Sequence, residues 1–268
     1  MQALKQWMMG GALCGILYAA IAYAPASWLA NGVASGTGGQ VLLQAPRGTV
    51  WQGSADLVMS GGAGSAGAVS LPSRLKWQIS PAWFGFDVSL SASCCTLAEN
   101  PVRLSLSTAA LDPRLGVDWR LNTAHLRVPA ELLTGLGAPW NTLQLAGEFL
   151  FASENLSGVW SGQGLQSLTG RASLQARQVA TALSTVRPLG SYLLTSADSV
   201  LRLETLADAP TDAVLILTGR GQIEAGRASF QGEAVAASGR EEALSNLLHI
   251  VGQWQPSTDG RSRSILKL

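Results

Sequence analysis

Residues 87–94 read DVSLSASC, and this stretch decides the fold because apolar and polar residues alternate one by one along it. The apolar members are Val88, Leu90, Ala92 and Cys94, and the polar members are Asp87, Ser89, Ser91 and Ser93. Successive side chains of a strand point to opposite faces, so a period of two is typical of a β-strand with one face toward a core. The stretch therefore predicts a half-buried strand.

The same alternation continues through most of the chain. It recurs in residues 103–107, 143–151 and 227–234, whereas residues 214–218 are apolar enough to predict a strand covered on both faces. Helical signals are few: residues 129–136, a turn within 183–190, and residues 241–252, where Leu244, Leu247, Leu248 and Val251 recur with helical spacing. The sequence predicts a mostly β protein, with a curved, largely antiparallel sheet and a few short helices.

The N-terminal segment predicts a membrane anchor. No charged residue occurs from Gln6 to Pro46, and residues 7–28 are mostly apolar or small, which is about the length of a bilayer-spanning helix. Lys5 before this segment places residues 1–6 in the cytoplasm and residues 29–268 in the periplasm, as a single-pass protein of the cell inner membrane. The candidate interfacial anchors are the aromatic residues Trp7, Tyr18, Tyr23 and Trp28.

A cleaved signal peptide is the alternative to an uncleaved anchor. Ala22-Tyr23-Ala24 has the small-x-small form of a cleavage site, and Ala24-Pro25-Ala26 offers a second one. Pro25 would follow the first cut directly, which is a poor context for cleavage. The sequence favours the anchor and leaves the alternative open.

Composition argues against several classes of function. A net charge of +1 disfavours a nucleic-acid binder, which needs clustered basic residues. The chain has no G-x-S-x-G or H-E-x-x-H motif, and His125 and His249 are predicted to be packed or surface residues, so no enzyme, metal site or cofactor is expected. The glycines at 62, 64 and 67 match a dinucleotide fingerprint, but a strand-like run follows them where the fingerprint requires a helix.

Two further features are candidate sites. Cys94 and Cys95 are adjacent, and they predict either two strand residues on opposite faces or a strained, easily reduced disulfide with a redox role. The first interpretation, two strand residues on opposite faces, is favoured.

The run Val50-Trp51-Gln52-Gly53 has an echo at residues 159–162, and residues 75–79 have one at 117–121. Repetition and chance both explain these echoes, and the structural or interface candidates are Trp51, Gly53, Trp77 and Trp160.

Several segments, in their order along the chain, resemble the type II secretion system protein N family (GspN). The most specific segment is GTVWQGSA at residues 48–55, followed by LKWQISP at residues 75–81. APASWL at residues 24–29, LSTVRPLGSY at 183–192, residues 219–232, the helix at 241–252 and Asp259-Gly260 extend the resemblance over most of the chain.

The resemblance implies a non-enzymatic component of the inner membrane that supports export of folded periplasmic proteins across the outer membrane. Its partners would be other type II secretion components, such as the outer-membrane secretin or the inner-membrane platform, besides membrane lipid around the anchor. The strand-rich body also resembles AsmA-like and TamB-like proteins, which suggests the alternative of envelope lipid handling. A continuous apolar channel along the sheet would favour that alternative, whereas polar residues and exposed aromatic hot spots would favour protein contacts.

Overall fold

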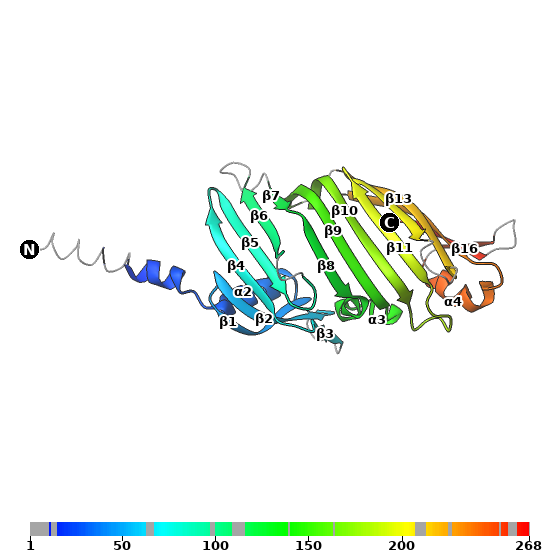
Figure 1. The fold of residues 1–268 in the computed structure, drawn as a ribbon, viewed down its shortest axis with the longest axis horizontal. Coiled ribbons are helices and arrows are strands. Elements are labelled where there is room, and N and C mark those ends of the chain that lie inside the picture. The colour runs from blue at the N-terminus through cyan, green and yellow to red at the C-terminus, as the bar shows by residue number, and fades with distance from the viewer. Residues whose placement is uncertain are drawn as a thin grey trace, which may run out of the picture.

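The computed structural model describes residues 11, 15–62, 67–96, 100–108, 116–138, 140–162, 164–206, 213–224, 227–251, 253–256 and 262–267. They form a 16-stranded sheet, elongated across the strands, with a few short helices along its lower rim in Figure 1. The pairs between strands are antiparallel, and the connected order is β1-β2-β4-β5-β6-β7-β9-β10-β11-β12-β13-β14-β16-β15, with β3 beside β2 and β8 beside β9. The predicted mostly β, antiparallel sheet is confirmed.

The N-terminal half of the sheet is built from short strands. Its strands are β1 (Val41–Gly48), β2 (Gln52–Ser60), β3 (Ala68–Ser70), β4 (Leu75–Ala82), β5 (Gly85–Ala92), β6 (Val102–Thr108), β7 (Val117–Leu121) and β8 (Ala124–Pro129). The predicted strand at residues 87–94 is confirmed as part of β5 up to Ala92, where the strand ends, and the predicted strand at residues 103–107 is confirmed as part of β6.

The C-terminal half contains the two longest strands. Its strands are β9 (Ala146–Ser161), β10 (Gly164–Ala180), β11 (Gly190–Ala197), β12 (Val200–Leu206), β13 (Leu215–Glu224), β14 (Arg227–Ala236), β15 (Gln253–Pro256) and β16 (Ser262–Lys267). The register of β9 and β10 shifts between Thr169 and Arg171, opposite Asn155, which has a φ of +47°. Gly170 takes a φ of +94° there, a conformation that glycine adopts without strain. Such a bulge adds twist and bends a sheet.

Two of the described helices, α2 (Ala26–Gly36) and α4 (Glu241–Val251), pack on the apolar side of the sheet. The short helix α3 (Trp140–Leu143) follows the 3₁₀ helix η2 (Ala130–Leu136). The predicted helices at 129–136 and 241–252 are confirmed within a residue or two, although residue 252 lies outside the described residues. The described residues 181–189 form turns and bends, so the predicted helical turn there is wrong; the cis bond before Pro188 lies in this segment.

The two faces of the sheet differ in chemistry. One row of cross-strand partners runs Ile79, Val88, Leu104, Leu121, Leu156, and the next row on the opposite face runs Ser80, Asp87, Ser105, Arg120, Ser157. In the C-terminal half, the apolar row runs Phe151, Leu174, Leu194, Leu203. The polar row beside it runs Ser173, Thr195, Arg202, Arg220. Along these rows, from β4 to β12, the sheet therefore has an apolar face and a polar face.

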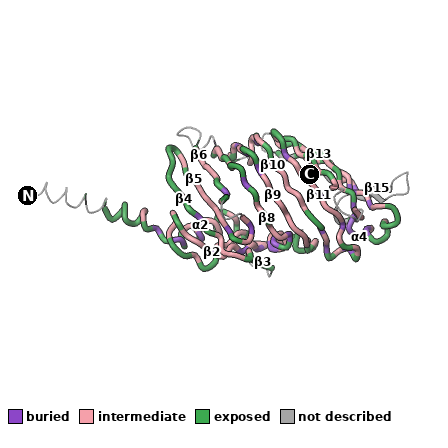
Figure 2. The backbone as a smooth tube through the Cα atoms, in the orientation of Figure 1, coloured by how far each residue is buried: buried purple, intermediate pink, exposed green. Residues whose placement is uncertain are grey.

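Two clusters of buried apolar residues lie on the apolar face in the described part of the chain, one near each end of the sheet. Near α2 the core contains Ala26, Ala55 and Trp77, and near α4 it contains Leu189, Leu215, Ala234, Ala236, Leu244, Leu247 and Leu248. Between these ends most strand residues are half-buried or exposed (Figure 2).

Ile216 on the polar side of β13 is 38 % exposed, so the prediction that residues 214–218 are covered on both faces is wrong. Residues 215–217 are all apolar, but only Leu215 and Leu217 pack in the core near α4, whereas Ile216 lies on the side that faces solvent.

The N-terminal segment projects from this body. Residues 15–22 are helical, and a break at Tyr23–Pro25 separates them from α2 (Figure 1). Pro25 disfavours helical backbone at the preceding residue and fits the start of a new helix. Among the described residues, no helix combines the length and the apolar character needed to cross a membrane.

Candidate functional site

The segment GTVWQGSA, which begins at the end of β1 and enters β2, joins the N-terminal helix to the sheet. Thr49 forms an isolated bridge with Pro25, and the Val50 amide donates to the Ala24 carbonyl at 2.8 Å. The indole Nε1–H of Trp51 donates to the carbonyl of Ile21 at 2.7 Å. The last carbonyls of a helix lack partners within the helix, so Trp51 supplies one of the missing donors. Three consecutive residues thus fix where the helix leaves the sheet.

The segment LKWQISP pairs with this junction from the neighbouring strand. The register of β2 and β4 places Gly53 opposite Trp77 and Gln52 opposite Gln78. The Trp77 ring is only 4 % exposed, and its Nε1–H donates to the carbonyls of Thr49 and Val50 at 3.2 and 3.0 Å. A Cβ atom on Gly53 would lie 2.5 Å from the Trp77 ring, so this position requires glycine. The two most specific segments of the sequence are therefore one structural unit.

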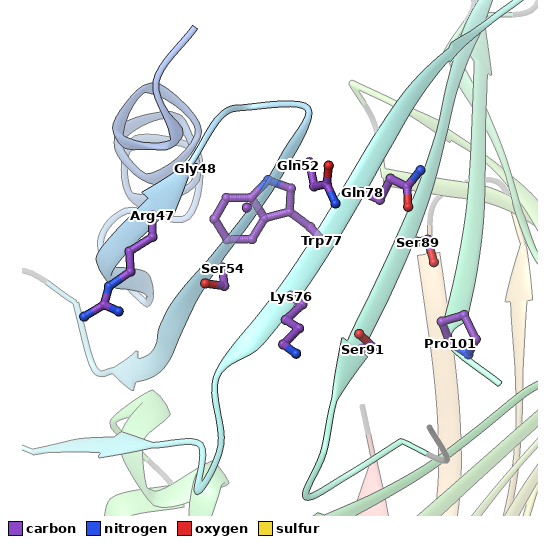
Figure 3. Close-up of a pocket in the computed structure, with 11 residues that line it drawn as sticks. Arg47, Gly48, Gln52, Ser54, Lys76, Trp77, Gln78, Ser89, Ser91 and Pro101 are labelled. Carbon is purple, nitrogen blue, oxygen red and sulfur yellow. The ribbon is translucent and has the colours of Figure 1, made fainter. Parts of the chain in front are cut away.

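On the polar side of the same strands the surface is hollowed. A depression of about 580 Å³ lies over β1, β2, β4 and β5, and the residues that line it are Arg47, Gly48, Gln52, Gly53, Ser54, Lys76, Trp77, Gln78, Ser89, Ser91 and Pro101. Figure 3 shows Arg47, Ser54 and Lys76 on three neighbouring strands. We name this depression the junction surface.

The junction surface is rich in hydrogen-bond donors and carries positive charge. Arg47 and Lys76 are its charged side chains, and the residues that line it include no carboxylate. Amides and hydroxyls supply further donors and acceptors around the two cations. Such a surface can bind a carboxylate or the polar backbone of another protein, but none of its side chains is an activated nucleophile or a base paired with one. Within the described part of the chain, no cluster of three or more His, Cys, Asp or Glu could hold a metal ion.

The predicted anchor residues lie away from the core. Tyr18 and Tyr23 are 75 % and 78 % exposed on the projecting segment, and Trp28 is 60 % exposed on α2. Trp7 lies outside the described residues. Their interfacial role stays a prediction.

Trp160, the echo of Trp51, has a different environment. It lies on β9 opposite Val117 and is 57 % exposed, and a Cβ atom on Gly162 would meet nothing within 4 Å. The counterpart of the Trp77–Gly53 pair is instead Trp119 above Gly158, where an added Cβ would lie 2.9 Å from the ring. Trp160 is therefore exposed where Trp77 is buried, and its role as a structural or interface residue stays a prediction.

Cys94 and Cys95 form a disulfide in the turn that follows β5. The favoured prediction of two strand residues is wrong, because β5 ends at Ala92. The amides of Cys95 and Thr96 both donate to the Ala92 carbonyl at 2.9 Å, which closes the chain into a turn. A redox role for the pair stays a prediction.

The remaining sequence candidates are placed as follows. His125 on β8 and His249 on α4 are exposed. Gly62 and Gly67 are described, and Gly64 lies outside the described residues. Because β3 begins at Ala68, the helix that a dinucleotide site needs does not follow the last glycine.

One exposed feature was not predicted. Trp83 and Phe84 form the tip of the β4–β5 hairpin and are 89 % and 61 % exposed. Their rings meet edge to face, with the ring centroids 5.8 Å apart. Two adjacent aromatics before Gly85 were the available signal.

Comparison with known families gives one match. The family model described as "Type II secretion system (T2SS), protein N" matches residues 39–263, which include both segments of the junction surface. The match begins after the projecting helix and after APASWL at residues 24–29. Neither the curated proteins nor the solved structures provide a match.

Proposed function

The chain belongs to the type II secretion system protein N family, and we propose that it is a non-enzymatic component that supports export of folded periplasmic proteins across the outer membrane by contacting other secretion components. The observation that carries this proposal is the family match over residues 39–263, which confirms the resemblance found in the sequence. Family membership implies interaction with other type II secretion components. The secretin and the inner-membrane platform are the candidate partners.

The proposal includes an anchor in the inner membrane. Its support is the uncharged segment up to Pro46 and the exposure of the projecting helix, where Ile16, Leu17 and Ile21 are 68 %, 61 % and 52 % exposed. Apolar side chains held away from a protein core gain free energy when lipid replaces water around them. With Lys5 on the cytoplasmic side, the sheet would stand in the periplasm, close to the membrane surface.

The proposal also assigns the junction surface to partner contact. Its cations and amides face solvent at the point where the body meets the anchor, so a membrane-bound partner would meet them first. Because the charged residues at such a surface steer association and set specificity, loss of Lys76 should weaken partner binding without unfolding the sheet.

Site-specific crosslinking in cells tests this assignment. A photoreactive amino acid is placed at Gln78 in the junction surface and, as a matched control, at Arg202, which is exposed on the same polar face in the C-terminal half. We expect adducts with another secretion component from position 78 and none from position 202. Absence of such an adduct at position 78, with normal amounts of the protein, contradicts the assignment.

A further inference from the structure

The apolar face of the C-terminal half encloses a cavity of about 280 Å³. Five strands, β9 to β13, form its floor, and α4 and the segment before β11 close it with Leu247 and Leu189. Its lining is Leu143, Leu145, Phe149, Leu174, Ala176, Val179, Thr181, Leu189, Tyr192, Leu194, Leu203, Leu215, Leu217 and Leu247. We name it the leucine cavity, because nine of these fourteen residues are leucines.

The leucine cavity offers almost no hydrogen bond to a ligand. Among the described residues that line it, Thr181 and Tyr192 are the two with polar side chains. The Tyr192 hydroxyl donates to the Leu215 carbonyl at 3.0 Å, and the Thr181 hydroxyl donates to the Leu143 carbonyl. Burial raises the pKa of Tyr192, as expected for a group surrounded by hydrocarbon.

This chemistry selects hydrocarbon over peptide. A peptide inserted into the leucine cavity would leave its own amides and carbonyls without partners, which is unfavourable in an apolar site. A hydrocarbon chain has no such groups to satisfy. Water is also a poor occupant, because the lining offers it almost no hydrogen bonds. The volume lies near the lower limit for small-molecule sites, about 300 Å³, so it suits a single chain.

The leucine cavity has a closed end and a more open end. At the closed end, Leu189, Leu215 and Leu247 are at most 4 % exposed. At the other end, Leu174, Leu194 and Leu203 form a row of cross-strand partners that are only half-buried. A chain would therefore enter over this row with its tail toward α4.

A buried hydroxyl lies just beyond the open end. Ser196 follows Leu194 by two residues on the same face of β11, so the two positions are about 7 Å apart along the strand. Ser196 is 8 % exposed, and among the described residues its Oγ atom has no hydrogen-bond partner. An unsatisfied buried hydroxyl is unfavourable, and a ligand oxygen at this point would satisfy it. A carboxylate or ester oxygen could accept a hydrogen bond from Ser196.

We infer that the leucine cavity binds one long acyl chain, with the tail against α4 and the carboxyl or ester oxygen at Ser196. This acyl chain belongs to a free fatty acid or to a phospholipid. Both carry the same hydrocarbon, and both have an oxygen on the first carbon of the acyl chain, in a carboxyl group or in an ester. This inference does not rest on the proposed role in secretion, and it concerns the opposite face of the sheet from the junction surface.

Photolabelling of the full chain in lipid nanodiscs tests it. One sample contains free palmitate with a photoreactive group near the tail, and a second contains a phospholipid with the same photoreactive chain. After irradiation, labelled peptides are mapped by mass spectrometry. We expect label on residues that line the leucine cavity; label from the first probe alone identifies a fatty acid, and label from the phospholipid identifies a membrane lipid. Absence of label there with both probes overturns the inference.

Paired variants of β11 make the test specific. Leu194→Trp fills the leucine cavity, whereas Leu193→Trp adds the same side chain to the polar face, where Leu193 pairs with Glu204. Leu194→Trp should reduce labelling of the lining at least tenfold and Leu193→Trp should not; equal labelling in both overturns the inference. If Leu194→Trp does not fold, Leu203→Trp takes its place, because Leu203 is also half-buried.

The hydroxyl contact has its own test. Ser196→Ala keeps the apolar lining but removes the oxygen, and it should reduce labelling several-fold with no loss of thermal stability. Unchanged labelling in this variant overturns the proposed orientation of the chain.

Discussion

Gly53 and Trp77 show how a single residue fixes the junction. The Trp77 ring occupies the space where a side chain at position 53 would stand, and an added Cβ would also lie 2.6 Å from the Arg47 carbonyl. Gly53→Ala should therefore destabilise the body by about 1–3 kcal/mol through overpacking. Thermal unfolding measures this, as a melting temperature several degrees lower.

Gly162→Ala is the matched control for Gly53→Ala. Gly162 holds the same place in the sequence echo but has open space around it, so its replacement should change the free energy of unfolding by no more than about 0.5 kcal/mol. A melting temperature that falls equally in both variants would contradict the role assigned to the Trp77–Gly53 pair.

Trp51 tests the connection between the helix and the sheet. Trp51→Phe keeps an aromatic ring but removes the donor to the Ile21 carbonyl, a hydrogen bond with a net contribution of about 1 kcal/mol. Limited proteolysis should then cut near residues 23–25 several-fold faster, while the core of the sheet keeps its melting temperature. The exposed Trp160 provides the control, since Trp160→Phe should leave cleavage at 23–25 unchanged. Cleavage there at the wild-type rate in Trp51→Phe would show that the indole donor is dispensable.

The disulfide in the turn after β5 should be dispensable for function. The turn keeps its backbone hydrogen bonds to the Ala92 carbonyl, and the Cys94 amide donates to the Ser73 hydroxyl at 3.1 Å, so the shape of the turn does not depend on sulfur alone. Replacement of Cys94 and Cys95 together by Ser should leave secretion largely intact. A secretion defect at normal protein levels would instead indicate a redox or crosslinking role.

At the residue scale, the sequence showed which residues make specific contacts better than it showed where those residues lie in the fold. Trp51 and Trp77 stood out from spacing alone, and both make specific contacts at the junction. Cys94 was assigned to a strand to which it does not belong, because the end of a strand depends on which strands pair with it. Short sequence windows do not contain this information.

Among the elements, α4 is the one whose packing is most clearly tied to its sequence. Leu244, Leu247 and Leu248 recur with helical spacing and are at most 3 % exposed against β13 and β14. Leu244→Ala should therefore destabilise the body by about 2–5 kcal/mol, measured by thermal unfolding. Asn246→Ala, on the exposed side of the same helix, should have little effect. Similar losses from both variants would mean that α4 does not pack as described.

Strands were harder to predict than α4 for a physical reason. Alternation identified the polar and apolar faces of β5, β6 and β14 correctly, because one face of each strand meets solvent. It failed for β13, where Ile216 is apolar but faces outward. Nor could alternation give the register that brings β2 beside β4 or the leucine cavity beneath α4, since cross-strand pairing is non-local.

At the scale of the whole molecule, the sheet offers two surfaces with different chemistry. The polar face, with the junction surface at one end, suits protein contact, and the apolar face, with the leucine cavity at the other, suits hydrocarbon. The leucine cavity lies within the C-terminal half and is smaller than a continuous apolar channel along the sheet. The family match concerns the secretion role, and the photolabelling experiment concerns the acyl chain, so each can fail without the other.

The proposed orientation in the membrane makes a separate prediction. A reporter that is active only in the cytoplasm, fused after Leu268, should be inactive, because the sheet would lie in the periplasm. The same reporter fused to a cytoplasmic protein controls for its folding. Full activity of the Leu268 fusion would contradict the orientation.

The central claim is that this chain acts in protein secretion, and a deletion strain tests it most directly. The measurement is the fraction of a folded type II substrate found outside the cell rather than in the periplasm, made alongside a detergent-sensitivity assay of the outer membrane. The account predicts that deletion retains substrate in the periplasm while the barrier stays intact, and that the wild-type chain restores export. Normal export, with or without a leaky outer membrane, would contradict it.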